Sequence, residues 1–326
     1  MRRILSAILA AVVFVSCFSL ASCSSNNDSA DSEGKVKVVT TIFPVFDWAR
    51  NVAGEDNSNV DITMLLDSGI DLHNYQPSSE DILKISDCDV FIYVGGESDE
   101  WVESALKKAE NKDMVTLNLT EALGDMAKKE ESIEGMQEEE GKEHEDEAEY
   151  DEHIWLSLKN AAVLTDAIKD AMCDADSSNK ETYESNADEY KGRISELDSA
   201  YADAVDNASY KTLIFADRFP FRYMTDDYGL SYYAAFKGCS AETEASFETV
   251  AFLAKKADEL GVRSIMTIEG SDGKIAKTVL ENTENKDMDI LSLNSMQSVT
   301  SEDVENGAAY LSIMEDNLDV LKKALK

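Results

Sequence analysis

The stretch that decides the fold reads VKVVTTIFPVFDWARNVAGEDNSNVDITMLL and covers residues 36–66. It begins with an apolar run rich in β-branched residues, continues with an amphipathic run at helical spacing, and ends with a second β-branched run. Strand, helix and strand in this order predict a βαβ unit, in which the two strands are parallel and the helix covers one face of the sheet.

The same alternation continues through residues 36–156. Its further helix-like and strand-like runs are SSEDILKISDC, DVFIYVG, SDEWVESALKKAE and MVTLNL. Ser78 or Ser79 and Ser98 precede helix-like runs and are expected to cap them, since a serine oxygen can accept a backbone N–H at a helix start. This part of the chain is predicted to form a first α/β lobe with a largely parallel sheet covered on both faces.

Residues 208–326 repeat this alternation and predict a second α/β lobe. The strand-like and helix-like runs are KTLIFA, LSYYAAFKG, SFETVAFLAKKADELG, RSIMTIE, KIAKTVLENT and MDILSL. A further helix is expected around Phe219 to Tyr228, and a closing helix from Ser301 to Lys326.

Residues 157–207 connect the two lobes and look almost wholly helical, with a break expected at Ser177 to Asn179. The second part carries an apolar stripe at helical spacing, formed by Tyr183, Tyr190, Ile194, Leu197 and Tyr201. A long helix between two lobes would be a rigid connector that allows limited lobe movement. The alternative is a helix that packs on one lobe alone.

The N-terminus has the form of a secretory signal. Arg2 and Arg3 precede an apolar run from Ile4 to Val15, and the sequence Leu-Ala-Ser then leads to Cys23. Because Leu-Ala-Ser followed by Cys23 resembles the lipobox of bacterial lipoproteins, we expect a signal peptide at 1–22 and a lipidated Cys23. Residues 23–35 should then form a flexible polar tether that anchors the protein outside the cytoplasmic membrane. The alternative is an ordinary secreted protein.

The chain is strongly acidic, with a formal net charge of -36. Such a balance excludes nucleic acid as a partner and favours the attraction of cations. Residues 125–150, at the end of the first lobe, are dominated by Glu and Asp without apolar periodicity, and we expect a disordered acidic loop. This loop is either a solvated spacer or a segment that loosely captures cations.

The cysteines beyond Cys23 are Cys88, Cys173 and Cys239. An odd number at wide spacings supports neither a disulfide framework nor a close-spaced thiolate site, and the three are interpreted as small core residues with one bridge possible.

Polar residues follow several predicted strands. His73 follows the strand that ends near Leu66, Asp217 and Arg218 follow KTLIFA, and Glu269 follows RSIMTIE. In open α/β sheets, ligands gather beyond the carboxyl ends of the strands, so these side chains should meet at one kind of sheet edge. His153 lies instead just after the acidic loop.

His73 and His153 are two of only three histidines, and both lie in motif-like loops. Two neutral imidazoles with carboxylates form a nitrogen and oxygen donor set that suits Zn²⁺ or Mn²⁺. We therefore expect a divalent metal site at this pair. For either histidine taken singly, a hydrogen-bonded structural side chain is the alternative.

From about Val36 to Lys326 the chain resembles the metal-binding solute-binding lipoproteins that serve zinc and manganese ABC importers. The matching segments, in order, are TTIFPVFDWARNVAG, DLHNYQPS with His73, DEHIWLSLKN with His153, YMTDDYGL and AAYLSIMEDNLDVL. The resemblance implies two α/β lobes joined by a long rigid helix, with a metal cleft between the lobes in which four side chains hold the ion. It also implies a monomer that delivers the ion to an ABC permease and turns over no substrate.

The sequence departs from that family pattern at the second-lobe ligands. Arg218 stands where the resemblance implies a third ligand, and an arginine cannot bind a cation. Our hypothesis is a one-residue shift that brings Asp217 to the metal, while Arg218 points away and pairs with an acid. The alternative is an Asp217 that only caps the following helix.

The fourth ligand is also altered. The loop LNSMQSVT offers no acid before Glu302, so Glu269 is the substitute candidate, and Glu242 and Glu244 are further options. Asn74, Tyr75 and Trp155 are interpreted as packing groups that orient the imidazoles.

Two other functions compete with metal capture. A zinc hydrolase would need an open coordination site and a general base, and the sequence lacks HExxH, GxSxG and Walker-type motifs. The second competing function is that of an adhesin or structural surface lipoprotein with a vestigial cleft, which the altered third ligand leaves open.

Overall fold

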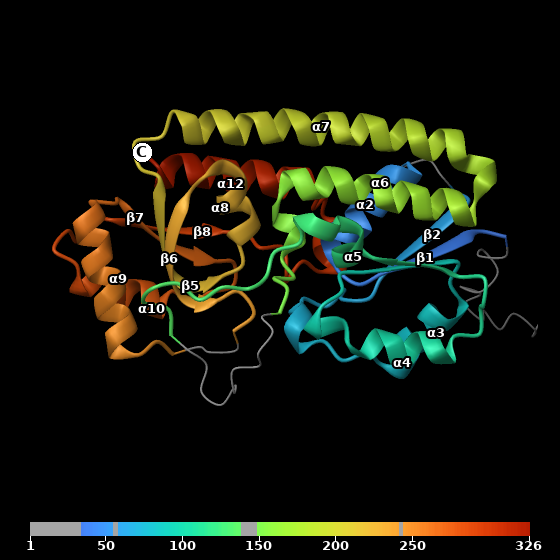
Figure 1. Ribbon diagram of the computed structural model, residues 1–326, viewed down its shortest axis with the longest axis horizontal. Helices are drawn as coiled ribbons and strands as arrows, with labels where there is room; N and C mark the ends of the chain where they lie inside the picture. The colour runs from blue at the N-terminus through green and yellow to red at the C-terminus, as the bar shows by residue number, and fades with distance from the viewer. Residues whose placement is uncertain (1–33, 55–57, 138–148, 241–243) are drawn as a thin grey trace, which may run out of the picture. The chain divides into compact units, whose positions relative to one another are not determined.

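Two four-stranded parallel sheets form the framework, one in each lobe (Figure 1). The first sheet has the order β2-β1-β3-β4 and the second the order β6-β5-β7-β8, so the two lobes share one strand topology. The strands are β1 (Val36–Thr40), β2 (Val60–Met64), β3 (Val90–Tyr93), β4 (Val115–Asn118), β5 (Thr212–Phe219), β6 (Ser231–Lys237), β7 (Ser264–Ile268) and β8 (Asp289–Leu293). The predicted pair of α/β lobes with parallel sheets is confirmed.

The computed structural model describes residues 34–54, 58–137, 149–240 and 244–326. The predicted signal peptide, the lipidated Cys23 and all but the end of the tether lie outside the described residues, as do His144 and Glu242. Within the described ranges, no helix has both the length and the apolar composition that a membrane span requires.

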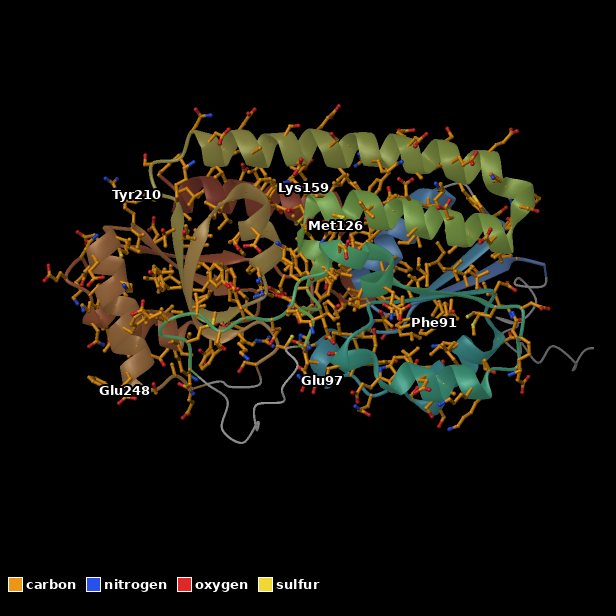
Figure 2. All side chains as sticks on the ribbon, in the orientation of Figure 1. Phe91, Glu97, Met126, Lys159, Tyr210 and Glu248 are labelled. Atoms are coloured by element: carbon orange, nitrogen blue, oxygen red, sulfur yellow. The ribbon has the colours of Figure 1, made fainter. Side chains whose placement is uncertain are left out.

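Helices cover both faces of the first sheet, with α3 and α4 on one side and α2 and α6 on the other (Figure 1). This lobe contains α2 (Phe43–Ala53), α3 (Ser79–Asp87), α4 (Trp101–Lys108) and α5 (Leu119–Leu123), with short 3-10 turns η1 (Leu72–Asn74), η2 (Glu97–Asp99), η3 (Gly124–Met126) and η4 (Ile154–Leu156). Burial from both faces explains the continuous apolar run VFIY of β3 and the buried second half of β1. Figure 2 shows Phe91 of β3, which is fully buried, inside this lobe.

The two predicted helix caps of this lobe have different outcomes. Ser78 caps α3 in a reciprocal pair with Asp81, because each side chain accepts the other's backbone N–H. Ser98 does not cap α4; it lies inside η2 and faces the histidine pair described below.

The second lobe contains α8 (Arg222–Tyr228), α9 (Phe247–Leu260), α10 (Lys274–Asn282), α11 (Ser301–Glu305) and α12 (Tyr310–Ala324). The predicted closing helix from Ser301 to Lys326 is therefore two helices. The chain turns between them at Gly307, whose φ of 96° lies in the region that favours glycine.

The connecting segment consists of α6 (Leu158–Ala175), the 3-10 turn η5 (Ser177–Asn179) and α7 (Lys180–Asp206), with the break where it was expected. Helix α7 contacts both lobes. Tyr190 Oη donates to Asp47 of α2, at 3.2 Å, and Tyr201 Oη donates to the Met314 carbonyl of α12, at 2.6 Å. The long helix thus joins the lobes and does not pack on one of them alone.

One apolar core runs through both lobes and the connecting helices, and a second, smaller core lies between β5–β7 and helices α9 and α10. Trp155 fixes the junction, because its Nε1 donates to the Ser295 carbonyl at 2.8 Å and its own carbonyl accepts from Tyr310 Oη at 2.7 Å. Residues Val36–Lys326 accordingly form one compact unit.

The acidic segment is more ordered than its composition predicts. Asp151 N donates to the Lys128 carbonyl at 2.8 Å, Glu130 N donates to the Glu149 carbonyl at 2.7 Å, and Gln137 N donates to the Ala235 carbonyl at 2.9 Å. The predicted disorder of residues 125–150 does not hold for 125–137 and 149–150, because backbone pairing fixes these residues whatever their side-chain charge. Residues 138–148 lie outside the described part of the chain.

Candidate metal centre

His73 lies in η1, beyond the carboxyl end of β2. The Asp71 side chain accepts from His73 N at 3.1 Å and thereby fixes the start of this turn. The imidazole is largely buried, and its Nδ1 lies 2.8 Å from Ser98 Oγ and 3.3 Å from Glu152 Oε2. Because Ser98 Oγ itself donates to Glu152, it accepts from His73 Nδ1–H, which leaves His73 Nε2 with a free lone pair.

His153 precedes η4 and is fully buried. Asp151 Oδ1 accepts both from His153 N and from His153 Nδ1, each at 2.9 Å. The Trp155 ring packs at 5.3 Å from the imidazole, centroid to centroid. Main chain, carboxylate and indole together hold the ring in one orientation, with Nε2 turned away from Asp151.

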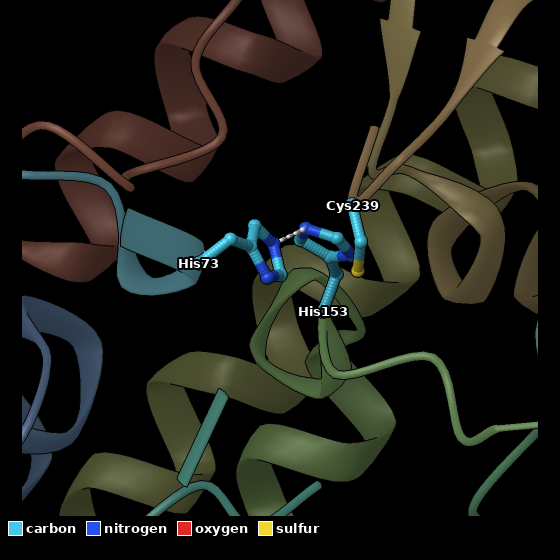
Figure 3. Close-up of side chains that lie close together, drawn as sticks. All are labelled: His73, His153 and Cys239. Atoms are coloured by element: carbon cyan, nitrogen blue, oxygen red, sulfur yellow. Dashed lines mark hydrogen bonds between the residues drawn. The ribbon is translucent and has the colours of Figure 1, made fainter. Parts of the chain in front are cut away.

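The two Nε2 atoms face each other at 3.3 Å (Figure 3). Zinc–nitrogen bonds of about 2.0–2.1 Å at a tetrahedral angle place two ligand nitrogens about 3.3–3.4 Å apart. The predicted pair is therefore brought together at the spacing of two ligands on one ion.

A thiol completes the group. The ligand atoms of His73, His153 and Cys239 all lie within 4.8 Å of one another, and Figure 3 shows the three side chains together. Cys239 follows β6 through Gly238, at the carboxyl end of that strand. It is a free, partly exposed cysteine and not the core residue that its spacing predicted; Cys88 and Cys173 are free as well, so the described residues contain no disulfide.

Carboxylates surround the imidazoles. Glu152 accepts from Ser98 N at 2.8 Å and from Ser98 Oγ at 2.5 Å. Burial raises the pKa of Glu152, but the neighbouring His73 and the hydrogen bonds from Ser98 outweigh burial, and the pKa is lowered. Gly96, with a φ of 98°, makes room for this carboxylate, since a Cβ there would lie 2.3 Å from Glu152 Oε1.

Burial lowers the pKa of His153, but the hydrogen bond to Asp151 and the charges of Asp151, Glu152 and Glu130 outweigh burial, and the pKa is raised. Protons therefore compete with a cation for His153 more strongly than they would at an ordinary histidine.

Arg218 and Asp217 lie at the end of β5, where the pairing with β6 shifts register between Phe215 and Arg218. Arg218 Nη1 pairs with Asp71 Oδ2 at 2.9 Å, which confirms the expected partner acid. The arginine does not point away from the site, however, because Asp71 Oδ1 lies 4.0 Å from His73 Nε2.

The Asp217 carboxylate is not grouped with the two imidazoles. Its Oδ1 accepts from Arg218 N at 2.9 Å, and its Oδ2 is buried without a hydrogen-bond partner among the described residues. It does not cap α8, which has no side-chain cap.

Glu269 is not grouped with the imidazoles either. Its oxygens accept from Ser295 N at 2.7 Å, Ser295 Oγ at 2.6 Å and Gln297 N at 3.3 Å, so this carboxylate fixes the loop after β8. Burial raises its pKa in spite of these hydrogen bonds. Glu244 is exposed and also stands outside the group.

Sequence reasoning missed Cys239, Ser98 and the two carboxylates Asp151 and Glu152. Cys239 could have been found by the strand-end rule that located His73, because it follows the run LSYYAAFKG. Asp151 and Glu152 directly precede His153, and an acid beside a ligand histidine is a recognisable pattern.

Two parallel α/β lobes on a long helix, with imidazoles and a thiol converging between them, define a two-lobed binding protein for a small ligand. Residues 38–324 match the family model described as zinc-uptake complex component A, periplasmic. The chain belongs to this family.

Two relatives and one solved structure illustrate the similarity. The zinc-binding lipoprotein AdcA of Streptococcus pneumoniae (strain ATCC BAA-255 / R6) is 34% identical over 324 residues, which cover 98% of this chain and 60% of AdcA. The high-affinity zinc uptake system protein ZnuA of Bacillus subtilis (strain 168) is 32% identical, with 96% of each chain covered. The crystal structure of the Zn(II)-bound ZnuA-like domain of S. pneumoniae AdcA matches with a TM-score of 0.69 at 30% identity, over 90% of this chain and 99% of that domain.

Proposed function

We propose that the protein captures a divalent transition metal, Zn²⁺ foremost and Mn²⁺ next, outside the cytoplasmic membrane and delivers it to an ABC permease. One observation carries this proposal: His73 Nε2 and His153 Nε2 lie 3.3 Å apart, and each Nδ1 is held by a fixed oxygen acceptor. The names of the zinc-uptake relatives support the same ion.

The outer acceptors prepare the imidazoles for a cation. A histidine that donates Nδ1–H to a carboxylate or to a hydroxyl bound to one has a fixed tautomer and a more basic Nε2. Asp151 does this directly and Glu152 through Ser98. Their negative charges also offset the charge of the ion.

From the second lobe, Asp217 remains our candidate acid. It is supported by the β5 register shift and by its buried Oδ2, for which the described residues offer no hydrogen-bond partner. Glu269 would have to release its hydrogen bonds to Ser295 and Gln297 before it could reach an ion. We therefore rank Asp217 above Glu269 as a ligand.

The site is proposed to hold its ion as cargo and not as the centre of an enzyme. Asp151 and Glu152, the carboxylates beside the imidazoles, accept hydrogen bonds and orient the rings, so neither is placed as a general base for a metal-bound water.

Anchoring through a lipid on Cys23 is proposed from the Leu-Ala-Ser-Cys sequence, and it is supported by the lipoprotein name of the streptococcal relative. Such an anchor would keep a monomeric binding protein near its permease.

The test of binding is a competition titration of chelator-stripped protein with Zn²⁺ and Mn²⁺. One zinc per chain is expected, and His73→Ala and His153→Ala should each lose most of the affinity. His144→Ala is the matched control, because His144 is the third histidine and lies in the acidic segment. Unchanged affinity in both site variants would overturn the proposal and favour the adhesin alternative.

Delivery is tested by zinc uptake into cells that lack the gene. The wild-type protein should restore uptake, and His153→Ala should not. If His153→Ala also restored zinc uptake, delivery to the permease would not depend on this site.

A further inference from the structure

Cys239 is the described cysteine that faces the histidine pair. Its Sγ lies with the two imidazoles inside one group of ligand atoms within 4.8 Å (Figure 3). Cys88, by contrast, is buried beside the end of α3, and its thiol donates to the Ile85 carbonyl. The position of its thiol therefore distinguishes Cys239 from Cys88.

The residue before it allows this approach. A Cβ added to Gly238 would lie 2.7 Å from His153 Cε1 and 3.0 Å from His153 Nδ1, and also 3.0 Å from the Phe219 carbonyl. No side chain larger than hydrogen fits there without moving the ring. The turn after β6 thus lies directly against His153, and this close approach brings the Cys239 thiol to the histidine pair.

Glu130 lies beside the thiol. Burial raises the pKa of Cys239 well above its usual range, and the charge of Glu130 and a hydrogen bond to it act in the same direction. Glu130 is itself held by the backbone pairing of residues 128–130 with 149–151, and Tyr223 Oη accepts from Lys128 N at 2.8 Å and donates to the Asp151 carbonyl at 3.0 Å. Glu130 therefore belongs to a segment that is paired with the residues directly before His153.

We propose that Cys239 is the third protein ligand beside His73 and His153 and that its thiolate makes the site select zinc over manganese. This inference rests on the proposed function and specifies its ion. When zinc binds, the Sγ–H bond breaks, a Zn–S bond forms, and one proton leaves to solvent; no electrons are transferred.

Ligand softness gives the reason for the selectivity. Thiolate sulfur and imidazole nitrogen favour zinc, whereas manganese favours carboxylate and water oxygens. Two nitrogens and one sulfur also leave one tetrahedral position, which a water or an acid of the second lobe can fill. The thiolate further supplies a negative charge from the second lobe, whereas Arg218 of that lobe carries a positive charge.

Cobalt(II) provides a direct probe, because a cobalt–thiolate bond gives a charge-transfer absorption band that nitrogen and oxygen ligands lack. The wild-type protein loaded with Co²⁺ should show this band. Cys239→Ser should bind Co²⁺ without it, and Cys88→Ser and Cys173→Ser, the matched controls, should keep it. A band that persists in Cys239→Ser, or is absent from the wild type, overturns the inference.

Selectivity is measured as the ratio of zinc to manganese affinity. Cys239→Ser should lower the zinc affinity by roughly tenfold or more, since even partners outside the ligand set contribute about 10- to 100-fold, and manganese affinity should change less. Cys239→Ala, with thermal unfolding as a check of folding, guards against a serine-specific effect. An unchanged ratio in both variants contradicts the inference, and the proposed function still stands if His73→Ala and His153→Ala lose affinity.

Discussion

Asp151→Asn isolates the charge that stands behind His153. Asp151 Oδ1 accepts from both His153 N and His153 Nδ1 at 2.9 Å, and the asparagine oxygen can accept the same two hydrogen bonds. The change therefore keeps the ring orientation and removes one negative charge. Because both residues are buried, solvent screens this charge little.

The expected loss follows from the hydrogen bond to Nδ1. A hydrogen bond to a charged group contributes about 1.5–3 kcal/mol and one between neutral groups about 0.5–1.5 kcal/mol. The difference, about 1–1.5 kcal/mol, corresponds to a roughly five- to tenfold loss of zinc affinity. Asp151→Ala, which leaves Nδ1 without its acceptor, should lose about 10- to 100-fold.

The assay is a zinc titration against a fluorescent chelator at several pH values. The Asp151 charge also raises the pKa of His153, so the wild-type protein loses more affinity to protons at low pH than Asp151→Asn does. The defect of the variant should therefore narrow as the pH falls. Asp174→Asn, the same change at the exposed far end of α6, is the control. Wild-type affinity in both Asp151→Asn and Asp151→Ala would refute the reasoning.

Three further predictions concern pH, packing and charge. Because the pKa of His153 is raised above 6.5, lowering the pH should start to weaken zinc binding before the pH reaches 6.5, and affinity should then decline by up to about tenfold per pH unit for each proton displaced. A flat pH profile of zinc affinity would contradict histidine ligation. Gly238→Ala should lower the free energy of unfolding by about 1–3 kcal/mol and weaken zinc binding, because the added Cβ would meet His153 and the Phe219 carbonyl. The control is Gly192→Ala in α7, where the added Cβ meets open space and neither quantity should change. Chemical unfolding measures the difference in stability. Arg218→Met should raise zinc affinity about two- to fivefold, because it removes a positive charge paired with Asp71 beside His73, and lower affinity in the titration would sink this prediction.

The strands and the connecting helices could be predicted because burial imposes a pattern on each of them. Parallel strands covered on both faces need continuous apolar runs, and Tyr183 to Tyr201 form a helical stripe because α7 buries one face. Ser98 shows the limit of such reasoning. Its place before a helix-like run fits a cap, but its partners, His73 and Glu152, come from distant segments.

The histidine pair could be located from the strand-end rule and the motif-like loops, but the second-lobe side of the site could not. Cys239 was judged by its spacing to other cysteines, and that spacing carries no information when the partner ligands are histidines from other segments. At Arg218, the direction of the side chain depends on a register shift in β5 that apolar periodicity does not reveal. The acidic composition of 125–137 likewise conceals the backbone hydrogen bonds that order it.

The central claim is that one divalent metal ion binds between His73 and His153. The most direct measurement is a crystal structure of the zinc-loaded protein with diffraction data recorded on both sides of the zinc absorption edge. We predict a single strong anomalous peak about 2.0–2.1 Å from both Nε2 atoms. A peak elsewhere, or none at this pair in protein shown to contain one zinc per chain, would contradict the account.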